Sequence, residues 1–189
     1  MNQQQGVLIV GAAALLFFVS KNANPSQPTA TAPTKKGLTI TENEALGWVT
    51  LNKLAYPSLG VLPESVVMAT IAVESNFDPN AVAPAGERGL MQVIYPGTWN
   101  DVIKRAKLPA DLDSFEHKDN ILVGMHYIRL VREELLRAGL ITGQNDTDWA
   151  LVDQAYNLGP AGVKAGRRNQ PRIGKFLLAR EKYQRAGLP

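Results

Sequence analysis

The chain has 189 residues, of which 45% are hydrophobic, a formal net charge of +3 and no cysteine. This length leaves room for one domain of ordinary size plus an appendage. The absence of cysteine excludes disulfides and thiolate metal sites, and His117 and His126 do not form an HExxH-type pair, so we expect no metal and no other cofactor.

Residues 6–19 form an apolar run of 14 residues without a charge. As a helix, this run is roughly 21 Å long, and polar flanks have to complete the span of a hydrocarbon core of about 30 Å. A secretory signal peptide is the alternative, but residues 1–5 contain no Lys or Arg and no small-x-small cleavage site follows closely. We expect residues 1–21 to be a retained transmembrane anchor that contacts the membrane through residues 6–20.

Residues 22–37 are rich in Pro, Thr, Ala and Asn and show no apolar period. This composition is typical of an extended, flexible linker. The sequence therefore predicts three parts, which are the anchor, the linker and a folded domain over residues 38–189.

The folded domain reads as nearly all helix, with no alternating segment long enough to form a substantial sheet. Thr41-Glu42-Asn43-Glu44 matches a capping box, which opens a helix that runs to about Tyr56. Thr147-Asp148 caps a later helix. Further helices are predicted at about 63–75, 97–107, 118–138 and 172–185.

Glu74 stands where the second helix should carry an apolar residue. Val67, Ile71 and Glu74 lie at i, i+4 and i+7, on one stripe of a helix that begins at Pro63. Apolar neighbours and the negative end of the helix dipole would both raise the pKa of Glu74, which suits a general acid that later acts as a base. The alternative is a solvated carboxylate at a frayed helix end.

Four motifs follow one another along the chain. They are Glu74-Ser75-Asn76-Phe77; Pro84-Ala85-Gly86 with Gly89-Leu90-Met91-Gln92; Asn120-Ile121 with Gly124 and Tyr127; and Ala155-Tyr156-Asn157 with Gly159 and Val163. In this order they resemble the catalytic core of the soluble lytic transglycosylases (SLT type), the peptidoglycan-cleaving branch of the lysozyme-like superfamily, which is similar to glycoside hydrolase family 23. The resemblance covers roughly residues 60–185. It implies a single lysozyme-like domain, all-α or α+β at most, with a substrate groove.

The resemblance implies that Glu74 is the sole acid/base. It also implies that Met91 packs on a sugar, that Gln92 hydrogen-bonds one, and that the Tyr156 hydroxyl holds the Glu74 carboxyl. Ser75 either orients bound sugar or only ends the helix, and Met91 on its own would be a core residue. The implied substrate-binding residues are Ser75, Met91, Gln92, Tyr156 and Asn157.

A common glycosidase needs two carboxylates, but Asp78 and Glu87 hold no motif position that would supply the second. The resemblance therefore implies substrate assistance, in which the N-acetyl group attacks its own anomeric carbon and Glu74 protonates the leaving oxygen. We expect cleavage of the MurNAc-β-1,4-GlcNAc bond in peptidoglycan with 1,6-anhydro-MurNAc ends. The alternatives are a goose-type-like lysozyme, which is a hydrolase, and a non-catalytic peptidoglycan-binding module of a virion.

Glu87 departs from the family, which more often has a small residue at this position. The charge lies in the loop near the cleft. It would either bias the site towards hydrolysis or point to solvent together with Arg88, and we expect the second.

Charge placement bears on partners and location. Residues 163–189 hold eight basic residues and one acidic residue, which favours an anionic partner such as the stem-peptide carboxylates of peptidoglycan. A solvated helix face is the alternative, and no recognition module indicates nucleic acid. Lys21, Lys35 and Lys36 follow the apolar run, and the positive-inside bias would place the domain in the cytoplasm, away from peptidoglycan. The chain is therefore either a bacteriophage enzyme carried in a virion membrane, for entry or exit, or a bacterial envelope enzyme on the periplasmic side.

Overall fold

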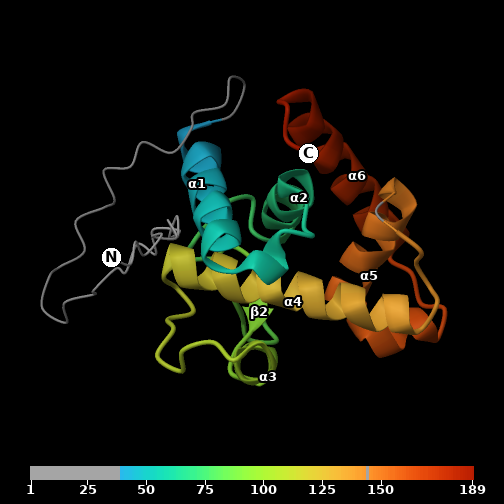
Figure 1. Ribbon diagram of the computed structural model, residues 1–189, viewed down its shortest axis with the longest axis horizontal. Helices are drawn as coiled ribbons and strands as arrows, with labels where there is room; N and C mark the ends of the chain where they lie inside the picture. The colour runs from blue at the N-terminus through green and yellow to red at the C-terminus, as the bar shows by residue number, and fades with distance from the viewer. Residues whose placement is uncertain (1–38, 144) are drawn as a thin grey trace, which may run out of the picture. The chain divides into compact units, whose positions relative to one another are not determined.

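The computed structural model describes residues 39–143 and 145–189. Within these residues the fold is six α-helices, one 3-10 helix and a two-stranded hairpin (Figure 1). The elements in chain order are α1 (Ile40–Ala55), η1 (Pro57–Leu59), α2 (Glu64–Glu74), β1 (Glu87–Arg88), β2 (Val93–Ile94), α3 (Gly97–Ala106), α4 (His117–Arg137), α5 (Asp146–Lys164) and α6 (Gln170–Arg185).

The predicted anchor, residues 1–21, and the predicted linker, residues 22–37, lie outside the described residues. Among the helices of residues 39–143 and 145–189, none combines the length and the apolar character needed to span a bilayer.

The helix α2 forms the centre of the core. Its residues 65–71 are all buried, including the polar Ser65 and Thr70, so protein encloses this part of the helix on every side rather than along one stripe. It packs against α1 and α6, and Figure 1 shows it between them. Pro63 precedes its first turn, where a missing N–H costs nothing, and Ser75 is its C-cap. Glu74 is therefore the last residue of the most deeply buried helix of the fold.

The predicted capping box of α1 is displaced by two residues. Thr39 is the N-cap, its hydroxyl accepts from the Glu42 N–H, and the Glu42 carboxylate accepts from the Thr39 N–H. Thr41 and Glu44 have the same spacing, so the sequence alone allowed both registers. Glu42 is buried and also accepts hydrogen bonds from Lys182 and Tyr183 of α6, whereas Glu44 is exposed, so contacts with α6 decide the register.

The other predicted helices are confirmed, with shifts at their ends. The helix α5 begins at Asp146 with Asn145 as its N-cap, in place of Thr147 and Asp148. The helix α5 also contains a kink, at which Gly159 adopts a φ of 72° directly before Pro160. Because Pro cannot continue the backbone hydrogen bonds and only glycine adopts this φ without strain, the chain changes direction there.

The hairpin of β1 and β2 is short, which agrees with the prediction that the domain contains no substantial sheet. Glu87 pairs with Ile94 and Arg88 with Val93. Asn120 of α4 fixes the loop between the strands, because its side chain donates to the Arg88 carbonyl at 2.9 Å and accepts from the Met91 N–H at 2.8 Å. The long helix α4 thereby holds the hairpin in place.

Replacing Glu42 by Gln should destabilise the protein in a pH-dependent way. Burial raises the pKa of Glu42, but hydrogen bonds from Lys182, Thr39 and Tyr183 outweigh it and lower the pKa from 4.5 to about 2. Because the folded-state pKa is lowered, the stabilisation is complete above about pH 4.5 and is lost as the pH falls through about 2.

We expect Glu42→Gln to lower the free energy of unfolding by about 1–3 kcal/mol at pH 7, since Gln keeps the cap but not the charge. Urea unfolding at several pH values measures this difference, which should shrink below pH 4.5. Glu44→Gln, on the exposed side of α1, is the control and should change the free energy by less than about 0.5 kcal/mol. A difference for Glu42→Gln that does not depend on pH would contradict the assignment.

Candidate active site

Glu74 belongs to a buried ion-pair network that joins three helices. Its side chain is 12% exposed, and its Oε1 accepts from Arg172 Nη2 at 2.7 Å. The same nitrogen donates to Asp153 Oδ1 at 2.7 Å, and Arg172 Nε donates to Asp153 Oδ2 at 2.8 Å. The guanidinium of α6 therefore bridges the end of α2 and the middle of α5.

Two opposing influences set the pKa of Glu74. Burial is the largest influence and raises the pKa, and the negative charges of Asp153 and Glu87 also raise it. The charge and the hydrogen bond of Arg172 lower the pKa. The net result is a raised pKa. The predicted desolvation of Glu74 is confirmed, and the alternative of a solvated helix end is wrong.

Arg172 and Asp153 were not predicted from the sequence as site residues. Arg172 is 98 residues away from Glu74, and it was counted only as part of the basic C-terminal segment. The sequence did contain a signal for Asp153, which is a charged residue where an apolar one is expected. Asp153 lies three residues before Tyr156, on a buried face of α5. Within the described part of the chain, no group of three or more metal-binding side chains is arranged to hold a metal ion.

Ser75 connects the end of α2 to the loop that follows β1. Its hydroxyl donates to the Leu90 carbonyl at 2.8 Å, and its backbone N–H donates to the Ile71 carbonyl. Ser75 ends the helix as its C-cap, and its predicted contact with bound sugar stays a prediction. Because the Ser75 hydroxyl donates its hydrogen to the Leu90 carbonyl, Ser75 holds the loop beside Glu74.

The structure corrects the predicted contacts of Met91 and Tyr156. Met91 has no exposed surface and packs against Gly124, so it belongs to the core and cannot pack on a sugar. Its backbone carbonyl accepts from the Tyr156 hydroxyl at 2.7 Å. The hydroxyl therefore holds the loop of Met91 instead of the Glu74 carboxyl, because α5 packs directly against that loop. Met91 and Tyr156 therefore support the site from its buried side.

Gln92 and Asn157 lie nearer to solvent. Gln92 has a φ of 47°, and its Nε2 donates to the carbonyls of Ala81 at 2.9 Å and Gly89 at 2.8 Å. Both amide hydrogens are thus occupied, and its side-chain oxygen is the group left to receive a donor. Asn157 is exposed on α5, and its Oδ1 accepts from Asn169 at 3.4 Å.

The expectation that Glu87 points to solvent together with Arg88 is wrong. Its Oε2 is covered by protein, and its charge acts on Glu74. The Arg88 guanidinium instead lies 4.1 Å above the ring of Tyr95 and near Ser114. Adjacent residues of a strand face opposite sides, so the two charges separate.

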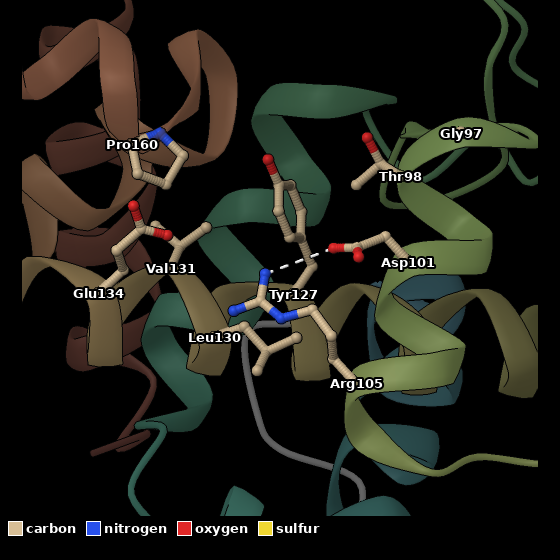
Figure 2. Close-up of a pocket in the computed structure, with 9 residues that line it drawn as sticks. All are labelled: Gly97, Thr98, Asp101, Arg105, Tyr127, Leu130, Val131, Glu134 and Pro160. Carbon is tan, nitrogen blue, oxygen red and sulfur yellow. Dashed lines mark hydrogen bonds and ion pairs between the residues drawn. The ribbon is translucent and has the colours of Figure 1, made fainter.

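A pocket of about 300 Å³ lies between α3, α4 and the kink of α5 (Figure 2). Figure 2 shows the ring of Tyr127 at its centre, with the Asp101–Arg105 pair on α3 to one side and Pro160 to the other. The Tyr127 ring lies 4.7 Å from that of Tyr156. Burial raises the pKa of Tyr127, and the charges of Glu134, Asp101 and Glu74 add to this effect.

Comparisons with known proteins agree with this geometry. The family model for the transglycosylase SLT domain matches residues 59–177, which confirms the predicted family. The chain is 34% identical over 124 residues to the membrane-bound lytic murein transglycosylase C of Actinobacillus succinogenes, which covers 63% of the chain and 33% of that protein. It is 32% identical over 105 residues to the protein of the same name from Mannheimia succiniciproducens, which covers 54% of the chain and 29% of that protein.

The solved structure of the 70 kDa soluble lytic transglycosylase SLT70 from Escherichia coli matches with a TM-score of 0.46 and 23% identity, over 75% of this chain and 26% of that one. The chain spans about a third of the length of the relatives that it matches.

Gly124→Ala should destabilise the protein through Met91. A Cβ at Gly124 would lie 2.3 Å from Met91 Sδ and 2.7 Å from Met91 Cβ, which is too close for either atom. We expect the free energy of unfolding to fall by about 1–3 kcal/mol, since the buried loop cannot move away. Urea unfolding measures this change.

Gly174→Ala is the matched control, because nothing lies within 4 Å of a Cβ at Gly174 in α6. It should raise the free energy of unfolding by about 0.5–1 kcal/mol through the helix preference of Ala. Equal effects of the two substitutions would show that Gly124 is not a packing constraint.

Proposed function

Because this chain belongs to the transglycosylase SLT domain family, we propose that it cleaves the MurNAc-β-1,4-GlcNAc bond of peptidoglycan by lytic transglycosylation. The observation that carries this proposal is Glu74, a nearly buried carboxyl with a raised pKa at the end of α2. A carboxyl whose pKa is raised holds its proton more firmly and is suited to donating it to a leaving oxygen, and the names of the relatives indicate murein as the substrate.

In the proposed reaction, Glu74 donates its proton to the glycosidic oxygen of the leaving GlcNAc. The bond from the muramoyl C1 to this oxygen breaks, and the carbonyl oxygen of the same residue's N-acetyl group bonds to C1. The 6-hydroxyl oxygen then displaces the N-acetyl oxygen at C1, and its proton passes to Glu74. The ring closes as 1,6-anhydro-MurNAc, and Glu74 is again protonated without any water being consumed.

Arg172 supports both halves of this cycle. It donates to Oε1 of Glu74, which leaves Oε2 to carry the proton. When the proton has left, the charged carboxylate remains hydrogen-bonded to the guanidinium, so its formation in a buried site costs less. The same contact fixes the orientation of the carboxyl, which general acid catalysis requires.

We propose that the glycan lies along the exposed residues beside Glu74. In this proposal the Gln92 side-chain oxygen, whose amide hydrogens are occupied within the protein, and the exposed Asn157 side chain form hydrogen bonds with the glycan. Ile94 and Tyr95 of the hairpin, 39% and 38% exposed, offer the apolar contact that the buried Met91 cannot make. Ser75, Met91 and Tyr156 act indirectly by fixing the loop. The pocket around Tyr127 would hold a neighbouring saccharide unit of the same strand (Figure 2).

We also propose that residues 6–20 anchor the enzyme in a membrane and that residues 22–37 let it reach nearby glycan strands. The name "membrane-bound" of the relatives supports an association with the cell envelope. The lysines that follow the apolar run favour a virion membrane as the alternative location. Detection of the chain in purified phage particles would establish that location, and its recovery from the bacterial envelope alone would refute it.

Mass spectrometry of the products tests the proposed reaction. The full-length chain is incubated with purified peptidoglycan, and Glu74→Gln, which keeps the shape of the side chain but holds no transferable proton, serves as the control. We expect 1,6-anhydro-MurNAc ends from the unmodified chain and a loss of at least about 10³-fold in rate for Glu74→Gln, since general acid catalysis contributes up to about 10⁴-fold.

Reducing MurNAc ends instead of anhydro ends would show a lysozyme. Binding to peptidoglycan without release of any fragment would show a binding module. Either result would refute transglycosylation.

A further inference from the structure

Glu87 lies on the hairpin that faces the end of α2. Ser75 joins α2 to Leu90, three residues after Glu87, by a hydrogen bond of 2.8 Å. Neighbouring residues of a strand point to opposite faces, and the Arg88 side chain extends towards Tyr95 and Ser114. The Glu87 side chain therefore lies on the other face of the strand, which it shares with its partner Ile94, and its charge raises the pKa of Glu74.

The carboxylate of Glu87 has no protein partner that explains its position. Its Oε2 is covered, and no hydrogen-bond donor within residues 39–143 and 145–189 contacts it. Covering a carboxylate oxygen without a donor is costly, so such groups are rare unless they serve a function. No ion pair links Glu87 to the neighbouring Arg88 among the pairs found in the described residues.

The charges around Glu74 come from three elements. Arg172 of α6 is positive, and Asp153 of α5, which it holds with two hydrogen bonds, balances it. Glu87 of β1 adds a negative charge that no cation offsets. Tyr156 and Tyr127 stay neutral because burial raises the pKa of both phenols above 10.0. Besides Glu74, one cation, Arg172, therefore faces two carboxyl groups, Asp153 and Glu87.

The negative charge of Glu87 matches what the proposed reaction needs. As the bond from C1 breaks, positive charge develops on the muramoyl ring and on its N-acetyl group. Arg172 alone would disfavour this charge, because it lies beside the acid that starts the reaction. A second carboxylate near the reacting sugar stabilises this charge, most strongly where water is excluded.

We propose that Glu87 is a second carboxylate of the active site, which stabilises the positive charge on the muramoyl residue while Glu74 transfers the proton. Glu87 itself neither gains nor loses a proton in the reaction. This inference rests on the proposed function. It gives this chain a pair of carboxylates in place of the single Glu74 that the family resemblance implied.

The test compares Glu87→Gln with unmodified full-length protein, with Glu44→Gln as a control for the loss of an exposed carboxylate. Turnover of purified peptidoglycan is measured as a function of substrate concentration and pH, and the products are analysed by mass spectrometry. We expect kcat of Glu87→Gln to fall at least about tenfold with KM changed less than about threefold, since the interaction forms in the transition state. The products should remain anhydro ends.

The pH profile distinguishes an electrostatic role from a structural one. Activity falls at alkaline pH as Glu74 loses its proton. Removing the negative charge of Glu87 lowers the pKa of Glu74, so the alkaline limb of the activity profile should move to lower pH in Glu87→Gln. In Glu87→Asp, which keeps the charge, this limb should lie closer to its pH in the unmodified protein. Should Glu87→Gln fail to fold, Glu87→Ala takes its place.

An unchanged kcat and an unchanged alkaline limb would refute the proposal. The proposal would also be refuted if the unmodified chain produced reducing ends and Glu87→Gln did not, because Glu87 would then activate water. If the unmodified chain releases nothing, the proposed function itself fails. In that case, an NMR titration decides whether Glu87 acts on Glu74: a lower Glu74 pKa in Glu87→Gln supports the pairing and an equal pKa refutes it.

Discussion

A carboxylate at the end of a buried helix has to be compensated, and in this protein Arg172 compensates it. Removing an ion from water costs several kcal/mol even after the surroundings relax, so the buried Arg172 needs an anion, which Asp153 supplies, and Glu74 needs a cation whenever it has given up its proton. Arg172 and Asp153 meet both needs through charge-assisted hydrogen bonds of 2.7 and 2.8 Å. The network also fixes α6 against α2 and α5, so the stability of the domain and the geometry of the acid depend on the same contacts.

The chemistry of the site follows from the balance of these charges. If Arg172 dominated, Glu74 would be ionised and could not act as an acid. Burial is the larger influence, and Asp153 and Glu87 add to it, so the pKa of Glu74 is raised while its orientation remains fixed. A carboxyl with a raised pKa and a fixed orientation suits the proposed reaction, in which Glu74 donates a proton and later recovers it without water.

Sequence reasoning succeeded where the signal is local. Helix positions follow from apolar spacing, and Glu74 stood out because a carboxylate interrupts an apolar stripe, although its role was assigned through the family motif that begins with it. It failed where the signal is not local. Arg172 was missed because its partner is 98 residues away, and Met91 was misassigned because a motif gives a position along the chain but not the direction of a side chain. The capping box of α1 was displaced because two registers have the same spacing and contacts with α6 select one.

The most direct measurement of the central claim is a ¹³C NMR titration of the Glu74 carboxyl in the intact protein, with assignment by Glu74→Gln. The account predicts a midpoint above the ordinary value of 4.5, because burial outweighs the attraction of Arg172. A midpoint at or below 4.5 would mean that Arg172 holds Glu74 in its charged form. Glu74 could then not serve as the general acid, and the proposed mechanism would be wrong.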